Sequence, residues 1–167
     1  AIVDRAHKDG VLPTIAVHDS YSSTIASAGG FVSREGVPAS IDINTYKAFA
    51  PTAMLTFIHE IGHLLDLAAI GTPGVFATLA GDVTLDGWRT AVDATDAVQT
   101  LRQRRSASTV EIQTPQGPAR EAVGQRHVEY LLGFDELWAR SYAQYIAERS
   151  MDATLIAALD LMRPPAI

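Results

Sequence analysis

The sequence contains no cysteine and no long hydrophobic run. Without cysteine there is no disulfide framework, and a metal site must be assembled from His, Asp and Glu side chains. No apolar run approaches the ~18 residues of a membrane-spanning helix, so we expect no membrane partner. No signal peptide is visible, but the chain starts at Ala1 rather than at a methionine. That start is compatible with excision from a longer protein, so the compartment stays open.

Positive charge is also scarce. The 167 residues carry 13 Lys and Arg against 19 Asp and Glu, a formal net charge of −6. Because nucleic-acid binding needs concentrated Lys and Arg, we expect no nucleic-acid partner. One basic cluster, Arg102, Arg104 and Arg105, fits the last turn of a helix, where the helix dipole favours cations. A site for an anion is the alternative interpretation of this cluster.

The rest of the composition, 47% apolar and 19% charged, is that of a globular protein, and the length predicts one domain over residues 1–167. Strand patterns precede helix patterns, which predicts an α+β fold. We expect a helix end at 1–8 and strands at 11–17, 30–33 and 39–43, the last two forming a hairpin around 34–38. Helices are expected at 51–70, 85–105, 123–132 and 135–162, with a loop or small hairpin at 106–124. Pro38 favours an edge position for its strand.

The stretch TFIHEIGHLLDL, residues 56–67, contains the HExxH pattern. Residues four apart lie on one face of a helix, so His59 and His63 can bind the same Zn²⁺ at about 2.0–2.1 Å. Glu60 projects beside the metal, where a general base for a zinc-activated water belongs. Gly62 costs the helix about 1 kcal/mol relative to Ala, which the close approach of a strand would explain.

A helix that happens to carry two core histidines is the competing interpretation of this stretch. Apolar residues surround the motif and leave almost no solvated face. Two histidines and a glutamate buried there without partners would be costly, because buried polar groups need hydrogen bonds or ligands. A single metal ion satisfies them together, and we therefore favour a zinc helix.

A catalytic zinc site needs a third protein ligand and leaves one position open. A third histidine six residues beyond His63 is excluded, because that position is Ala69. Asp66 lies on the same face and is better placed to brace a ligand or to cap local polar groups. The acids of the later helices remain as third ligands: Glu136, Asp135, Glu129 and Glu148.

HEIGHLLD at 59–66 and FDELWARSYAQYI at 134–146 together resemble the gluzincin-type HExxH zincins. The pair is similar to the family of the anthrax lethal factor catalytic domain and the Pro-Pro endopeptidases. Those proteins share an HExGHxxD helix and a later ExxAE-like helix. The pair is also similar to zincin domains of phage head-morphogenesis and polyvalent proteins, which carry an ELFAR pattern. The resemblance covers 59–66 and 130–146, and elsewhere extends to element order alone.

The resemblance implies a zincin-like fold, with a small twisted, mostly antiparallel sheet packed on the HExxH helix and a helical C-terminal half. It implies Zn²⁺ as the cofactor, His59, His63 and Glu136 as ligands, and Glu60 as general base. A tyrosine shortly before the ligand glutamate stabilises the oxyanion in this family. Tyr130 is the candidate here, with His127 and Tyr142 as alternatives.

The chain departs from the lethal-factor pattern at Arg140, where that family has an acid that orients a ligand histidine. The ELFAR pattern has arginine there too. Since Arg cannot accept a proton from imidazole, Asp66 or a backbone carbonyl would take that outer role.

The sequence therefore predicts a zinc endopeptidase whose protein or peptide substrate binds as an extra strand on one strand of the predicted hairpin. Gly29-Gly30 would let the preceding loop move. One rival is a non-catalytic zinc domain of a phage or mobile-element protein. A protease effector toxin with one host target is another, and a binding module with two core histidines is the third. Cytoplasmic, phage-associated and secreted settings all remain open, as does the oligomeric state.

Overall fold

The structure is a computed structural model that describes residues 2–3, 12–24, 27–107, 109–114 and 117–162. The helix end expected at 1–8 lies mostly outside these residues. The predicted α+β class is confirmed: three strands come first, and helices make up most of the chain after them. Among the described residues, no helix combines the length and the apolar character needed to cross a membrane.

A small mixed sheet contains the strands β1 (Ala16–Ser20), β2 (Gly29–Arg34) and β3 (Val37–Asn44) in the order β1-β3-β2. The predicted hairpin is confirmed as the antiparallel pair β2–β3. Its turn places Glu35 and Gly36 at positive φ, 51° and 76°, which suits a two-residue hairpin turn. β1 begins later than expected, at Ala16, and continues through Ser20.

Two expectations about the sheet were wrong. β1 pairs parallel to β3, so the sheet is mixed rather than mostly antiparallel. Pro38 lies on the central strand rather than on an edge. The proline is tolerated because β1 pairs with β3 only from Ser40 onward, so the N–H that Pro38 lacks costs no bond to β1.

The HExxH helix α2 (Ala53–Ala68) comes directly after a single 3-10 turn at Ala50–Thr52 that contains Pro51. The short helix α3 (Ala77–Ala80) and a 3-10 turn at Val83–Leu85 come next. The helix expected at 85–105 is two helices, α4 (Asp86–Asp93) and α5 (Asp96–Ser106). The break comes at Thr95, whose backbone is extended. Its side-chain hydroxyl caps α5 by accepting a hydrogen bond from the Val98 N–H.

The basic cluster falls in α5 as predicted, with Arg104 and Arg105 in its last turn. The predicted small hairpin is present as β4 (Thr109–Thr114) and β5 (Gly117–Ala122), and α6 spans Gln125–Leu131. The last predicted helix is also two helices, α7 (Phe134–Ser150) and α8 (Ala153–Met162). Met151 adopts the left-handed conformation between them, and the Asp152 carboxylate accepts the first N–H groups of α8.

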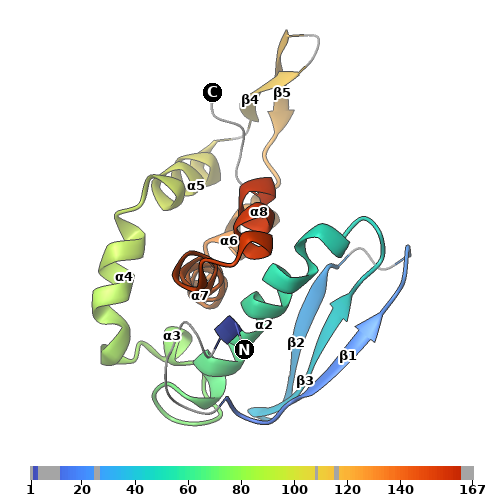
Figure 1. The fold of residues 1–167 in the computed structure, drawn as a ribbon. Coiled ribbons are helices and arrows are strands. Elements are labelled where there is room, and N and C mark those ends of the chain that lie inside the picture. The colour runs from blue at the N-terminus through green and yellow to red at the C-terminus, as the bar shows by residue number, and fades with distance from the viewer. Residues whose placement is uncertain (1, 4–11, 25–26, 108, 115–116, 163–167) are drawn as a thin grey trace.

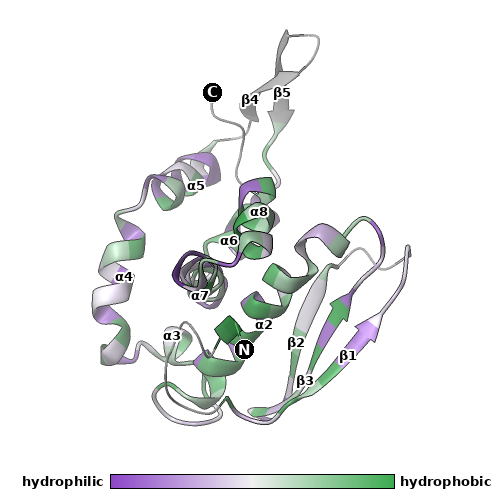
Figure 2. Ribbon diagram, in the orientation of Figure 1, coloured by the Kyte–Doolittle hydropathy of each residue, from purple (hydrophilic) through white to green (hydrophobic). Residues whose placement is uncertain are grey.

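The elements form layers, with α2 lying between the sheet on one side and α7 on the other, and α4 and α5 beyond α7 (Figure 1). Figure 2 shows that α2 is largely hydrophobic and α5 largely hydrophilic, in keeping with their central and outer positions. The core forms between the inner face of the sheet, α2, α7 and α8. Its largest fully buried side chains include Ile41, Ile58, Ile146 and Leu155.

Candidate metal centre

The two histidines of the HExxH motif lie one turn apart on α2. Their ring centroids are 4.9 Å apart and the ring planes cross at 83°. His63 is buried and also stacks against Phe31 of β2, with ring centroids 6.4 Å apart. The four-residue spacing of the motif thus places both imidazoles side by side on the same face of α2.

α7 crosses α2 at the motif, and Gly62 makes that crossing possible. A Cβ atom on Gly62 would lie 2.8 Å from the Cα of Ala139, closer than real Cβ contacts come. The Trp138 indole N–H donates to the Gly62 carbonyl oxygen over 3.0 Å. We expected a strand to approach Gly62, and that expectation was wrong: the approaching element is a helix. The close crossing brings residues of α7 to the histidines.

Glu136 is the residue of α7 that reaches both rings. Its Oε1 lies 3.4 Å from His63 Nε2, and its Oε2 lies 3.6 Å from His59 Nε2. One ligand atom from each of these three residues lies within 4.8 Å of the others, and this trio is the one such group within the described residues. Of the other acids considered, Glu129 and Glu148 are exposed on α6 and α7. Asp135 lines a cavity beside His63.

Electrostatics tie this trio together. Burial alone would raise the pKa of Glu136, but hydrogen bonds with His59, His63 and Tyr130 outweigh it and hold the pKa well below its usual range. For His63, burial acts to lower the pKa, but the hydrogen bond to Glu136 and the charge of Glu60 raise it overall. Arg140 adds a further contact, with Nη2 3.4 Å from Glu136 Oε2. A carboxylate only 5% exposed is thus kept ionised between the two imidazoles.

Glu60 lies beside the trio and is 6% exposed. Burial raises its pKa above the ordinary value, and the neighbouring histidines moderate that rise. The backbone N–H of Phe31 donates to its carboxylate, which connects Glu60 to strand β2. This bond has no signature in the sequence, because it depends on the placement of β2 above α2.

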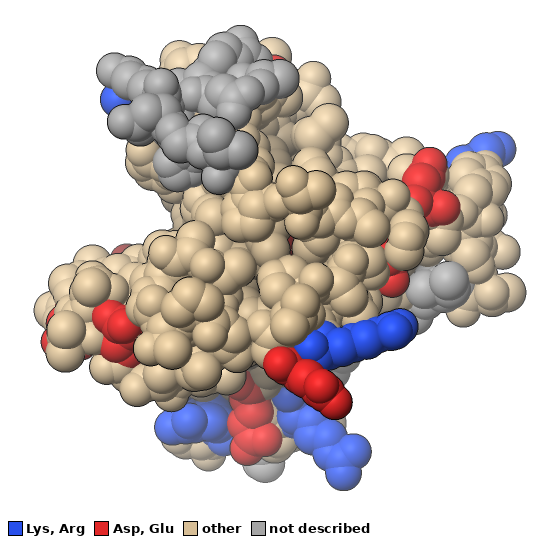
Figure 3. Space-filling model, turned by 90° about the horizontal axis from the view of Figure 1, so that it is seen from below, with Lys and Arg blue, Asp and Glu red and all other residues tan. Residues whose placement is uncertain are grey.

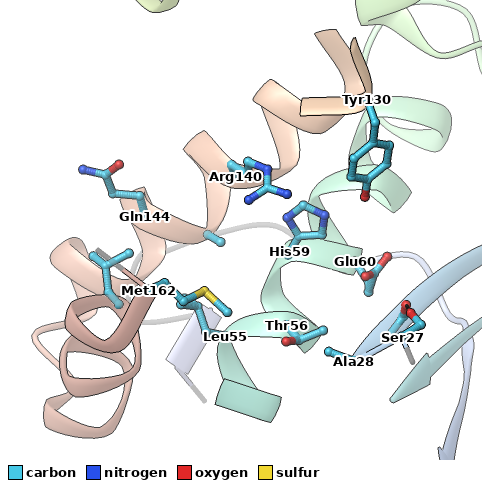
Figure 4. Close-up of a pocket in the computed structure, with 13 residues that line it drawn as sticks. Ser27, Ala28, Leu55, Thr56, His59, Glu60, Tyr130, Arg140, Gln144 and Met162 are labelled. Carbon is cyan, nitrogen blue, oxygen red and sulfur yellow. Dashed lines mark hydrogen bonds between the residues drawn. The ribbon is translucent and has the colours of Figure 1, made fainter. Parts of the chain in front are cut away.

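Two cavities meet at Glu60 and Gly29. One, of about 330 Å³, runs along α2 past His59 toward Leu55 and Met162. Figure 4 shows this cavity with the Arg140 guanidinium directed toward His59. The second, of about 250 Å³, lies on the His63 side and is lined by Phe31, Phe76 and Asp135 among others. The trio is therefore reached from solvent on both sides.

Tyr130, at the end of α6, lines both cavities and remains 53% exposed. Its hydroxyl donates to the Glu136 carboxylate, and burial together with this bond raises the pKa of the phenol. The alternatives lie elsewhere. His127 stacks on the Tyr130 ring with centroids 6.2 Å apart, and it does not line either cavity. Tyr142 lines a separate apolar cavity on the other side of α7.

Asp66 is fully buried and holds α3 against α2. Its Oδ1 accepts the Thr78 N–H over 2.9 Å, and its Oδ2 accepts the Thr78 hydroxyl over 2.5 Å. The sequence suggested that Asp66 braces a ligand or caps local polar groups. Its two hydrogen bonds to Thr78 fit the capping role. Burial raises the pKa of Asp66, and its bonds to Thr78 and the charge of His63 only partly offset that rise.

The donor set fits a borderline divalent metal ion. Two imidazole nitrogens and one carboxylate oxygen are ligands that zinc accepts together in open sites. Both Nε2 atoms already face the same carboxylate, so the three donors require little rearrangement to share one ion. No family model matches this chain, and neither curated proteins nor solved structures give a match.

Proposed function

We propose that this protein is a zinc-dependent peptidase. The observation that carries the proposal is the convergence of His59, His63 and Glu136 beside the buried Glu60, with cavities on both sides. His59, His63 and Glu136 would hold the zinc ion. When bound, zinc supplies Lewis acidity, polarising a carbonyl and lowering the pKa of a bound water to about 7.

Glu60 is the proton carrier in this proposal. It takes a proton from the attacking water and passes it to the nitrogen of the leaving amine, as a general base and then a general acid. Burial in the cleft wall raises its pKa, which suits a group that must both accept and release a proton. The Tyr130 hydroxyl donates a hydrogen bond, without losing its proton, to the oxygen on which negative charge develops. Its position at both cavities and its present bond to Glu136 support that role.

The substrate would bind as an extended strand along β2. β2 is an edge strand, with β3 on one side and no described strand on the other. Its residues Gly29, Gly30 and Phe31 line the cavity that contains Glu60 and His63. Main-chain hydrogen bonds along an open edge bind a peptide without regard to its sequence.

A non-catalytic zinc domain is the rival that shares the same ligands. Structural zinc sites are usually closed by four protein ligands, whereas catalytic sites keep a position open. Three residues make up the cluster among the described residues, and the buried Glu60 beside them has no use in a purely structural site. Both observations favour the catalytic proposal.

Glu60→Gln tests the proposal directly. The change keeps the shape and the Phe31 bond acceptor but removes the proton carrier, so peptide hydrolysis should fall by about 10²–10⁴-fold. Cleavage of a random-sequence peptide library, followed by mass spectrometry, measures it on zinc-loaded protein, with zinc content determined in parallel. Equal hydrolysis by both proteins, or none by the wild type, would sink the peptidase assignment.

A further inference from the structure

A second polar cluster lies on the face of the sheet that points away from α2. His18 Nδ1 on β1 lies 3.0 Å from Asp42 Oδ1 on β3, and the Ser40 hydroxyl donates to the same oxygen over 3.0 Å. Both contacts use Oδ1, and the Asp42 side chain is 49% exposed. The carboxylate is therefore oriented by two neighbours while part of it still faces solvent.

This cluster is not a nucleophilic triad. Such a triad needs a serine hydroxyl that donates to the histidine, and the histidine in turn to the acid. Here Ser40 and His18 both contact Asp42, and the serine contact found is to the acid rather than to the ring. The arrangement orients a carboxylate, which is the chemistry of a cation-binding subsite.

Gly30 connects this cluster to the open edge of the sheet. It stands directly opposite Asp42 in the β2–β3 pair, so both positions face the same side. A Cβ atom on Gly30 would meet no atom within 4 Å. A cavity of about 350 Å³ occupies this space, and its lining includes His18, Asp42 and both Gly29 and Gly30. The missing side chain leaves a passage from the edge of β2 to Asp42.

The same pair sets the register of an added strand. The Asn44 N–H donates to the Ala28 carbonyl oxygen, and hydrogen-bonded and non-hydrogen-bonded pairs alternate along an antiparallel ladder. Gly30 therefore bonds to β3, and the Phe31 N–H points away from β3. A peptide residue placed opposite Gly30 on the open edge would share the face of Gly30 and Asp42. Its side chain would have to cross β2 to meet the Asp42 side chain on β3, and the added strand and β3 are two strand spacings of about 4.8 Å apart. Lys and Arg are the side chains long enough to span that distance and end in a cation.

We propose that the substrate carries a lysine or arginine at the position that lies opposite Gly30, and that Asp42 binds its cationic end. This inference rests on the proposed function, because it uses the substrate strand along β2. Asp42 selects substrates and takes no part in the chemistry, which occurs on the opposite face of β2. His18 and Ser40 are positioning residues that hold the Asp42 carboxylate toward the passage.

The test is a set of internally quenched peptides built on a sequence that the zinc-loaded wild type cleaves. Each position around the cleaved bond carries Lys, Arg, Gln or Glu in turn, and kcat/KM is measured for every peptide. At one position, kcat/KM for the Lys and Arg peptides should exceed that for the Gln peptide about tenfold or more, as expected for a charge-assisted hydrogen bond. Asp42→Asn should bring that ratio close to one. Gly30→Leu should do the same by filling the passage.

Asp19→Asn is the matched control. Asp19 is the neighbour of His18 on β1 and accepts from the Thr45 hydroxyl, and it does not line the cavity. The Asp19→Asn change removes the same charge as Asp42→Asn. The ratio of kcat/KM for basic peptides to that for the Gln peptide should therefore stay at the wild-type value. A wild type that cleaves peptides with no basic preference overturns the inference and leaves the peptidase proposal intact. So does a preference that Asp42→Asn does not change. A zinc-loaded wild type that cleaves no peptide overturns both.

Discussion

Three carboxylates are buried on α2 and α7, and each has partners that offset its burial. Glu136 lies against two imidazoles, Glu60 accepts the Phe31 N–H, and Asp66 accepts two bonds from Thr78. The HExxH pattern predicted where His59, Glu60 and His63 lie, because helical periodicity is a local property. The bonds to Phe31 and Thr78 could not be predicted, because they join segments by tertiary packing alone.

Tyr130→Phe tests the role of the phenol. Removing one donor to a developing oxyanion costs about 10²–10³-fold in kcat, so we expect that loss with KM little changed. The hydroxyl also bonds Glu136, so zinc content is measured beside the rate to separate the two effects. His127→Phe is the control, since His127 stacks on the same ring without lining either cavity. An unchanged kcat in Tyr130→Phe would make Tyr130 a packing residue.

Asp66→Ala tests whether Asp66 holds α3 against α2 or orients the His63 ring. The change leaves the Thr78 N–H without its acceptor in the core, which should cost about 1–3 kcal/mol of unfolding free energy. Asp66→Asn keeps an acceptor for that N–H and should recover much of the loss. Urea unfolding and zinc titration measure both variants. A variant Asp66→Asn that is stable but binds zinc weakly would assign Asp66 to His63 instead.

Single elements were predicted well where their signals are local and less well at their ends. The β2–β3 hairpin, α2 and α6 lie close to where turn chemistry and periodicity placed them. The helices expected at 85–105 and 135–162 each divide in two. Thr95 and Asp152 act as caps inside continuous helical patterns, and a capping residue in such a pattern resembles an ordinary polar surface residue.

Gly62→Ala tests the crossing of α2 and α7. The added methyl group would meet the Ala139 backbone, so the helices must separate, at a cost of about 1–3 kcal/mol. Because Glu136 is three residues from Ala139, zinc affinity should fall as well. Chemical unfolding and zinc titration provide the two readouts.

Gly87→Ala in α4 is the control for this variant. A Cβ atom on Gly87 would meet no atom within 4 Å, and Ala in place of Gly at such a site stabilises by about 0.4–1 kcal/mol. A Gly62→Ala protein as stable as the wild type, with unchanged zinc affinity, would show that the crossing does not set the position of Glu136.

At the scale of the whole molecule, the layered order places α2, which carries His59 and His63, between the sheet and α7, which carries Glu136 (Figure 1). The α+β class could be predicted from element order, but the parallel pairing of β1 could not. β3 comes last of the three strands along the chain and lies between β1 and β2, and tertiary packing rather than a local sequence pattern sets that order. The view from below in Figure 3 shows acidic and basic side chains in small mixed groups, with no continuous basic surface among the described residues of that face. The expectation of no nucleic-acid partner stays a prediction.

The central claim is that one zinc ion joins α2 to α7, and zinc content by mass spectrometry tests it most directly. We expect one zinc ion per chain in the purified wild type and a sharp reduction in Glu136→Ala, because that change removes the third ligand. Glu129→Ala, which removes an exposed acid of α6, should keep the full zinc content. Full zinc in Glu136→Ala, or none in the wild type after refolding with the metal, would contradict the account.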